Sequence, residues 1–127
     1  MGRILAIDYG SARIGIAISD ETKTIAQVRP YILNREKEKI IDLIQNSEVE
    51  EVLLGLPVGL SGQETQSTKK VRTFESWLKE KTNLPVKMID ERLTTQEVRR
   101  FEANKELIDS LVAQKMLERY LEMQKSK

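Results

Sequence analysis

Three carboxylates stand where folding alone would not place them. Asp8 follows the apolar run of residues 4–7, Glu91 follows the run of residues 86–89, and Asp109 falls within the apolar stripe of the last predicted helix. Burying a carboxylate costs free energy unless a cation or hydrogen bonds offset that cost. Acidic groups from distant parts of the chain, each at the rim of the predicted core, therefore indicate a shared site for a hard divalent cation.

Each carboxylate also has a simpler explanation. Asp8 could cap the turn at Gly10. Glu91 could pair with Arg92, and Asp109 could cap a helix that starts later than its pattern indicates. The coincidence of all three carboxylates at one predicted edge favours the shared site over three separate structural roles.

The elements that must position these residues follow from hydrophobic periodicity. Apolar residues alternate or run together in three extended stretches at the N-terminus, at residues 3–7, 14–18 and 25–33. Pro30 interrupts the third stretch, which favours an edge position. We expect these three strands to form an antiparallel meander.

The second half of the chain alternates helical and extended patterns. Helices are predicted at residues 35–46, after a capping pair formed by Ser61 and Glu64, from Thr94 onward, and at residues 107–123. Further strands are predicted at residues 49–56 and 86–89. The order predicts an α/β fold with a five-stranded mixed sheet, made of the meander and two parallel strands and flanked by helices.

This fold would bring the carboxylates together. Ligands of open α/β sheets collect beyond the carboxyl ends of parallel strands, where Asp8 and Glu91 lie. In the last helix Asp109 shares a stripe with apolar side chains and is predicted to face the sheet. The opposite side of that helix is predicted to carry the polar residues Ser110, Gln114, Glu118 and Glu122.

Composition limits the chemistry. The chain has 127 residues, which we assign to one domain, residues 1–127, and it contains neither Cys nor His. Thiolate nucleophiles, Cys-ligated zinc and His-based triads are therefore excluded. The net charge of +1 gives no support for a strongly basic nucleic-acid binder. No stretch reaches the roughly 18 apolar residues of a membrane span and no leader pattern opens the chain, so we expect a cytoplasmic protein without a membrane partner.

Two arginines could support chemistry at the acidic edge. Arg13 follows the first turn and Arg92 follows Glu91, so both could bind phosphate oxygens bidentately. Ion pairing with Asp20, Asp90 or Glu91 is an equal alternative for them. With Gly10 and Thr94 they complete the predicted substrate-binding set, although Thr94 also suits a helix cap.

At these residues the chain resembles the YqgF family, also called RuvX, whose members are named for Holliday junction resolution and for pre-16S rRNA cleavage. Four segments carry the resemblance: Asp8 to Ala17, Gly55 to Pro57, Asp90 to Thr95, and Lys105 to Asp109 with Ala113 and Leu117 to Leu121. The chain departs from the family pattern in the loop after Pro57 and in the connection between Glu97 and Asp109.

The resemblance implies an RNase H-like fold and a metal-dependent nuclease, a hydrolase of phosphodiester bonds. It assigns the acidic positions to Asp8, Glu91 and Asp109, as catalytic residues and metal ligands. We expect a two-metal site for Mg²⁺ or Mn²⁺, with Asp8 bridging both ions.

The expected role is processing of the 5′ end of pre-16S rRNA in ribosome biogenesis, with RNA favoured over branched DNA. A Holliday junction resolvase-type DNA endonuclease and a non-catalytic RNA-binding or assembly protein remain the alternatives. The expected assembly is a monomer or a homodimer.

Overall fold

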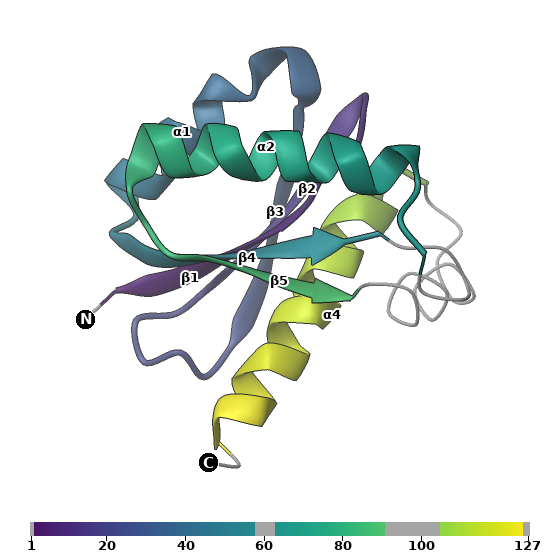
Figure 1. The fold of residues 1–127 in the computed structure, drawn as a ribbon. Helices are drawn as coiled ribbons and strands as arrows, with labels where there is room; N and C mark the ends of the chain where they lie inside the picture. The colour runs from purple at the N-terminus through teal and green to yellow at the C-terminus, as the bar shows by residue number, and fades with distance from the viewer. Residues whose placement is uncertain (1, 58–62, 91–104, 126–127) are drawn as a thin grey trace.

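The computed structural model describes residues 2–57, 63–90 and 105–125, which form a five-stranded sheet with the order β3-β2-β1-β4-β5 (Figure 1). The strands β1 and β2 pair antiparallel, as do β2 and β3, whereas β4 runs parallel to both β1 and β5. The predicted mixed sheet is therefore confirmed. The strand bounds are β1 (Arg3–Asp8), β2 (Arg13–Ser19), β3 (Ala26–Leu33), β4 (Val49–Leu56) and β5 (Val86–Asp90).

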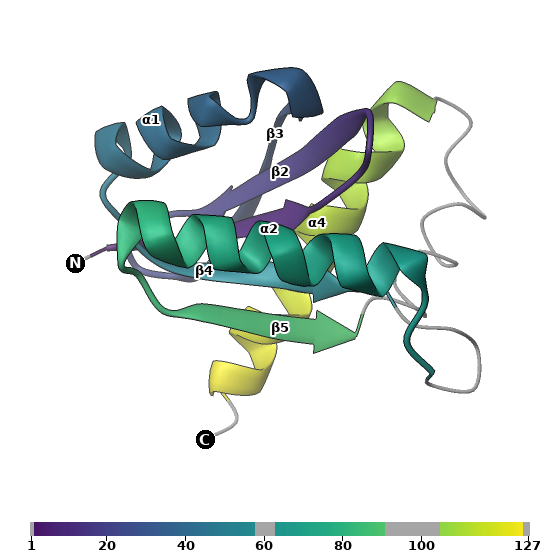
Figure 2. The same cartoon turned by 45° about the horizontal axis from the view of Figure 1, so that its top comes forward.

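Helices cover both faces of the sheet. One face carries the 3-10 turn η1 (Asn34–Glu36) with α1 (Glu38–Asn46) and α2 (Gln66–Thr82), and the other carries α4 (Lys105–Lys125), as Figures 1 and 2 show. The last helix extends beyond the predicted residues 107–123 at both ends. The short helix predicted from Thr94 lies outside the described residues.

The two faces of the sheet bury separate apolar layers because successive strand side chains point to opposite faces. In β1, Leu5 and Ile7 belong to the layer beneath α1 and α2, whereas Ile4 and Ala6 belong to the layer beneath α4. The α4 layer also receives Val112, Ala113, Met116, Leu117 and Tyr120. The α4 face is lined by smaller strand residues, which lets the helix approach the sheet closely.

The ends of α2 differ in part from the prediction. Asn83 adopts a left-handed conformation (φ 58°) after the last turn, so the predicted break before Pro85 is confirmed. The N-cap, however, is Thr65, whose side chain and that of Thr68 form a reciprocal capping box. The predicted cap at Ser61 was therefore wrong, because the helix begins four residues later, where Thr65 is the cap and its side chain accepts from the Thr68 amide.

The edge position predicted from Pro30 is confirmed, since β3 is an outer strand of the sheet. Proline cannot donate a ladder hydrogen bond, and an edge strand tolerates that loss. The pairing of β2 with β3 shifts its register between Ile14 and Ile16. Over the ranges that the structure describes, no helix combines the length and apolarity needed to cross a bilayer.

Candidate active site

The carboxyl ends of β1, β4 and β5 share one edge of the sheet. Ile7 is level with Leu54, and Leu56 is level with Asp90, so the three strands finish together. Asp8 is the last residue of β1 and lies at this edge. The register thus places the strand ends where the sequence predicted them.

Asp8 lies on the side of the sheet that α4 covers. It follows Ile4 and Ala6 in the alternation of β1, and both of those residues pack in the α4 layer. The side chain is half-buried. Asp8 therefore shares a layer with Asp109, the first half-buried acidic residue of α4 whose side chain the structure describes.

Gly15 connects the two carboxylates. It stands opposite Asp8 in the β1–β2 pair. A Cβ added to Gly15 would lie 2.0 Å from the carbonyl oxygen of Asp109 and 2.7 Å from the amide nitrogen of Ser110. Only glycine permits this approach of backbone to backbone. Asp8 and Asp109 thus adjoin the same residue, one across the strand pair and the other across the layer.

A buried hydroxyl fixes α4 at this point. Ser110 is 2% exposed, and its Oγ accepts a hydrogen bond from the Ile16 amide at 3.2 Å. That amide lies where the β2–β3 register shifts, which explains why a side chain and not a strand is its partner. The prediction that Ser110 faces away from the sheet was wrong. Gln114 also turns toward the sheet and donates to the Ala26 carbonyl at 3.1 Å.

Arg13 brings a cation to the same place. Its Nε lies 3.3 Å from Oδ2 of Asp109, and its guanidinium carbon lies 5.6 Å from the centre of the Tyr31 ring. The two ion-paired side chains are 35% and 22% exposed, so water reaches both. Of the alternatives weighed for Arg13, ion pairing occurs, and the partner among the described residues is Asp109, which was not one of the expected partners Asp20, Asp90 and Glu91. Glu91 itself lies outside the described residues.

The turn between β1 and β2 is held by its own backbone and by η1. A Cβ on Gly10 would meet the Arg13 carbonyl oxygen at 2.3 Å, so the turn requires glycine there. Asn34 donates through Nδ2 to the Gly10 carbonyl and through its amide to the Ala12 carbonyl, each at 2.9 Å. Ser11 is exposed beside them and accepts a hydrogen bond from Lys70 of α2 at 3.4 Å.

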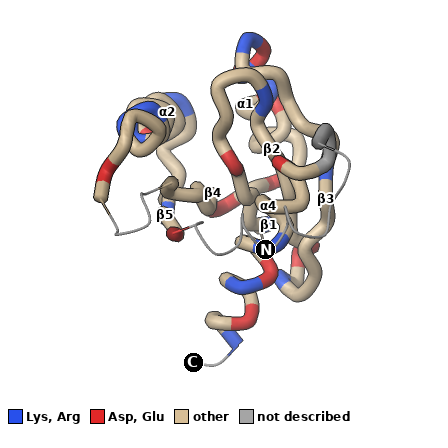
Figure 3. The backbone as a smooth tube through the Cα atoms, turned by 90° about the vertical axis from the view of Figure 1, so that its right-hand side faces the viewer, with Lys and Arg blue, Asp and Glu red and all other residues tan. Residues whose placement is uncertain are grey.

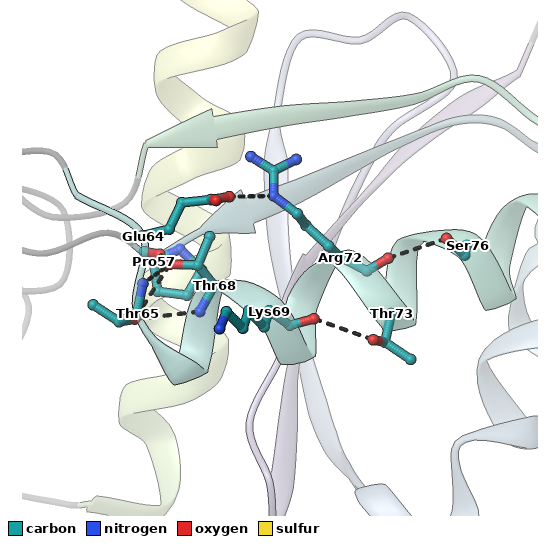
Figure 4. Close-up of polar contacts among 8 residues, drawn as sticks. All are labelled: Pro57, Glu64, Thr65, Thr68, Lys69, Arg72, Thr73 and Ser76. Atoms are coloured by element: carbon teal, nitrogen blue, oxygen red, sulfur yellow. Dashed lines mark hydrogen bonds and ion pairs between the residues drawn. The ribbon is translucent and has the colours of Figure 1, made fainter.

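The start of α2 is tied to the end of β4 (Figure 4). The hydroxyl of Thr68, which is fully buried, donates to the Pro57 carbonyl and accepts from the Thr65 amide at 3.0 Å. Arg72 pairs with Glu64 in the same view, at 2.5 Å. Figure 3 views the molecule from this side, and basic and acidic positions are both spread over the described chain.

Sequence reasoning missed three residues of this arrangement. Gly15 was noted only within the segment Asp8 to Ala17, and Ser110 was placed on the opposite side of its helix, because a contact between α4 and β2 leaves no mark in the periodicity of either element. Tyr31 was counted only as part of a strand. Its ring, at the outer strand, contacts the arginine that begins the neighbouring strand.

Comparison with known proteins identifies the family of this chain. The family model described as "RuvX: Holliday junction resolvase" matches residues 2–123. The chain belongs to the RuvX family. This confirms the resemblance carried by the segments around Asp8, Pro57, Glu91 and Asp109.

Relatives with the name "Putative pre-16S rRNA nuclease" match this chain over 71% to 99% of their own length. The one from Koribacter versatilis is 38% identical, covering 95% of this chain and 87% of the relative. The one from Halothermothrix orenii is 37% identical, covering 96% of each. Among solved structures, Thermus thermophilus RuvC in complex with a Holliday junction substrate aligns with a TM-score of 0.60 at 13% identity, over 98% of this chain and 96% of that one. This likeness confirms the RNase H-like fold.

The acidic site of this RuvX-family member is only partly described. Glu91, Arg92 and Thr94 lie outside the described residues, which end at Asp90 in this region. In the part of the chain that the structure does describe, no three acidic side chains lie together as a metal site. Asp8 and Asp109 offer carboxylate oxygens, the ligands that Mg²⁺ and Mn²⁺ prefer, so the described residues fit a divalent cation by donor type.

Proposed function

We propose that this chain is a metal-dependent nuclease that hydrolyses phosphodiester bonds, with the 5′ end of pre-16S rRNA as its substrate. The observation that carries the proposal is that both β1 and α4 adjoin Gly15 of β2. Asp8 lies opposite this glycine in the strand pair, and the backbone of Asp109 approaches it from α4. The names of the 38% and 37% identical relatives support the substrate.

Asp8, Asp109 and Glu91 would hold Mg²⁺ or Mn²⁺ as a two-metal site. Such ions, when bound, lower the pKa of water and stabilise the oxygen that leaves the phosphorus. Asp8 is the best placed to serve both ions, because it ends the central strand of the sheet. Glu91 follows directly on Asp90, the last described residue of β5, whose end lies at the same edge.

The chain's other residues would bind and orient the nucleic acid. We assign phosphate contacts to Arg13 and Arg92, since a guanidinium matches phosphate oxygens in shape and charge. Gly10 would let a strand approach the backbone of the β1–β2 turn, and Thr94 would add a hydroxyl. Lys70, which reaches Ser11 of that turn, gives a further cation on the same path.

The proposal is tested by Asp8→Asn and the matched variant Asp42→Asn, which changes an exposed aspartate on α1. Labelled precursor rRNA, single-stranded RNA and a four-way DNA junction are each incubated with Mn²⁺ and with chelator. Loss of an outer partner of a metal ligand already costs about 10- to 100-fold, so Asp8→Asn should slow cleavage by more than that. Asp42→Asn should cleave at the parental rate, and a parental rate for Asp8→Asn would disprove the assignment.

The same assay separates the alternatives. The family description favours junction resolution as the second candidate. Cutting two opposed strands requires two active sites and therefore a homodimer, so preferred cleavage of the junction together with a dimeric mass in solution would select it. RNA binding without cleavage under every metal condition would select the non-catalytic assembly role. For rRNA processing we expect a cytoplasmic protein, as a monomer or a homodimer.

A further inference from the structure

Arg13 touches two partners of different kinds. Its Nε pairs with the Asp109 carboxylate at 3.3 Å, and its guanidinium lies over the Tyr31 ring, 5.6 Å from the centroid. The three residues come from β2, α4 and β3, so the contact forms only in the folded sheet. A guanidinium carries five N–H donors, and contact with one carboxylate oxygen through Nε does not exhaust them.

The ion pair is one that a stronger partner can replace. Strong arginine–carboxylate pairs are bidentate, with N–O distances of roughly 2.7–2.9 Å, whereas the contact of Arg13 is made through Nε at 3.3 Å. Both side chains are partly exposed, and exposed pairs contribute little to stability. The ring contact with Tyr31 does not depend on Asp109, so Arg13 stays attached to the protein when the ion pair opens.

The Asp109 carboxylate cannot bind Arg13 and a divalent cation equally strongly at the same time. A dication attracts a carboxylate more strongly than a single delocalised charge does, and it repels the guanidinium beside it. The repulsion is relieved if Arg13 finds another anion close by. A phosphodiester group of the nucleic-acid substrate is such an anion. It would bind at the edge of the sheet where β2 begins with Arg13.

We propose that Arg13 is a placeholder for the metal ion at Asp109 and couples metal binding to nucleic-acid binding. Without metal, Arg13 pairs with Asp109 and neutralises it. When a divalent cation binds, Arg13 leaves Asp109, remains over Tyr31 and binds a phosphate oxygen. The proposal rests on the assignment of Asp109 as a metal ligand. By linkage, each ligand then raises the affinity for the other by the same factor.

The test measures two affinities on the full chain. Mn²⁺ binding is followed by calorimetry, with and without a short 2′-O-methyl phosphorothioate RNA that resists hydrolysis. Binding of the same labelled RNA is followed by fluorescence anisotropy, with and without Mn²⁺. The variants are Arg13→Gln, Tyr31→Leu and Arg3→Gln. Arg3 is the matched control, because it begins β1 and pairs with Glu21 at 3.4 Å at the other end of the sheet.

We expect the parental protein to show coupling of about fivefold or more between Mn²⁺ and RNA, at the lower end of the usual range for allosteric coupling. Arg13→Gln should bind Mn²⁺ more tightly than the parental protein when RNA is absent, and its coupling should fall to about one. Tyr31→Leu should bind RNA more weakly in the presence of Mn²⁺. Arg3→Gln should match the parental protein in every measurement. Thermal melting of each variant checks that it is folded.

The outcomes separate this inference from the proposed function. If Asp109→Asn binds Mn²⁺ as tightly as the parental protein, Asp109 is not a metal ligand and both proposals fail. If Asp109→Asn loses Mn²⁺ binding but Arg13→Gln binds Mn²⁺ no more tightly and keeps the coupling, the placeholder role alone is overturned. Arg13→Lys gives a second check, because lysine keeps the positive charge but lacks the planar guanidinium group. This variant should retain the parental Mn²⁺ affinity and bind RNA more weakly.

Discussion

The layer between α4 and the sheet holds an acidic group at each end, and the described contacts of the two groups differ in length and geometry. At the far end, the Tyr120 hydroxyl donates to Glu51 at 2.6 Å, and Lys87 donates to that hydroxyl at 2.8 Å and pairs with Glu51 at 3.3 Å. At the carboxyl edge, Asp109 meets Arg13 through one nitrogen at 3.3 Å.

The contacts at the far end shift the pKa of two of its side chains. Burial, followed by the hydrogen bond to Glu51, raises the pKa of the Tyr120 hydroxyl, and the hydrogen bonds to Tyr120 and Glu51 raise the pKa of Lys87. The Lys87 hydrogen bond opposes part of the Tyr120 shift by lowering the pKa of that hydroxyl. A network of short hydrogen bonds holds a helix in place, whereas the Arg13–Asp109 contact is long and partly exposed to water, and such pairs contribute little to stability.

The largest expected effect comes from making the same change at each end, Asp109→Ala and Glu51→Ala. Asp109→Ala should lower the cleavage rate by more than about 100-fold, beyond the loss expected for an outer partner of a metal ligand, and should change the free energy of unfolding by less than about 1 kcal/mol. Glu51→Ala leaves the Tyr120 hydroxyl without its acceptor and should cost about 1–3 kcal/mol, with cleavage retained. Urea unfolding and RNA cleavage measure the two quantities, and the comparison fails if both variants lose activity equally.

A smaller effect should follow from Gly15→Ala. The added Cβ would lie 2.0 Å from the Asp109 carbonyl oxygen, a backbone atom that cannot rotate away. We expect a loss of about 1–3 kcal/mol, as for overpacked cores, and a displaced α4 that also lowers cleavage. Gly2→Ala is the comparison near the N-terminus, where the three atoms nearest to an added Cβ belong to the Glu50 side chain, from 2.6 Å outward, and not to the backbone of α4. Equal unfolding free energies for Gly15→Ala and the parental protein would show that α4 is not seated as described.

The smallest expected effect is a loss of stability at alkaline pH, and it concerns only the Tyr120–Lys87–Glu51 network at the far end. The pKa of Tyr120 and that of Lys87 are raised by folding, so their stabilisation is present at neutral pH and is lost as the pH rises through the folded values, above the ordinary values of about 10. Tyr120→Phe removes the tyrosine titration. Its melting temperature should therefore fall less between pH 9 and 11 than that of the parental protein. Identical slopes would contradict the assignment.

The kinds of strand in the sheet were predictable because they follow from short-range patterns. The three extended stretches at the N-terminus, the position of Pro30 and the apolar run in β4 indicated a meander followed by parallel strands, whereas the full order β3-β2-β1-β4-β5 is a finding of the structure. The stripe argument also held for the other members of the Asp109 stripe, since Ala113, Met116 and Tyr120 of α4 are buried against the sheet.

Contacts across layers were not predictable from such patterns. The exposed side expected for Ser110 followed from its polarity, but a small hydroxyl can enter a layer when it meets an unpaired amide, here that of Ile16. The partner of Arg13 depends on where α4 passes over β2. That position is seen only in the folded chain, where the helix backbone approaches Gly15 closely. Glu91 lies outside the described residues, so its place beside Asp8 stays a prediction.

The outer strand β3 has a consequence for behaviour in concentrated solution. An outer strand presents unpaired amides and carbonyls that can recruit another chain edge to edge. Here Pro30 supplies no amide, and Gln114 occupies the Ala26 carbonyl. These two features interrupt the row of groups that a second sheet would need. Edge-to-edge association along this strand is therefore disfavoured.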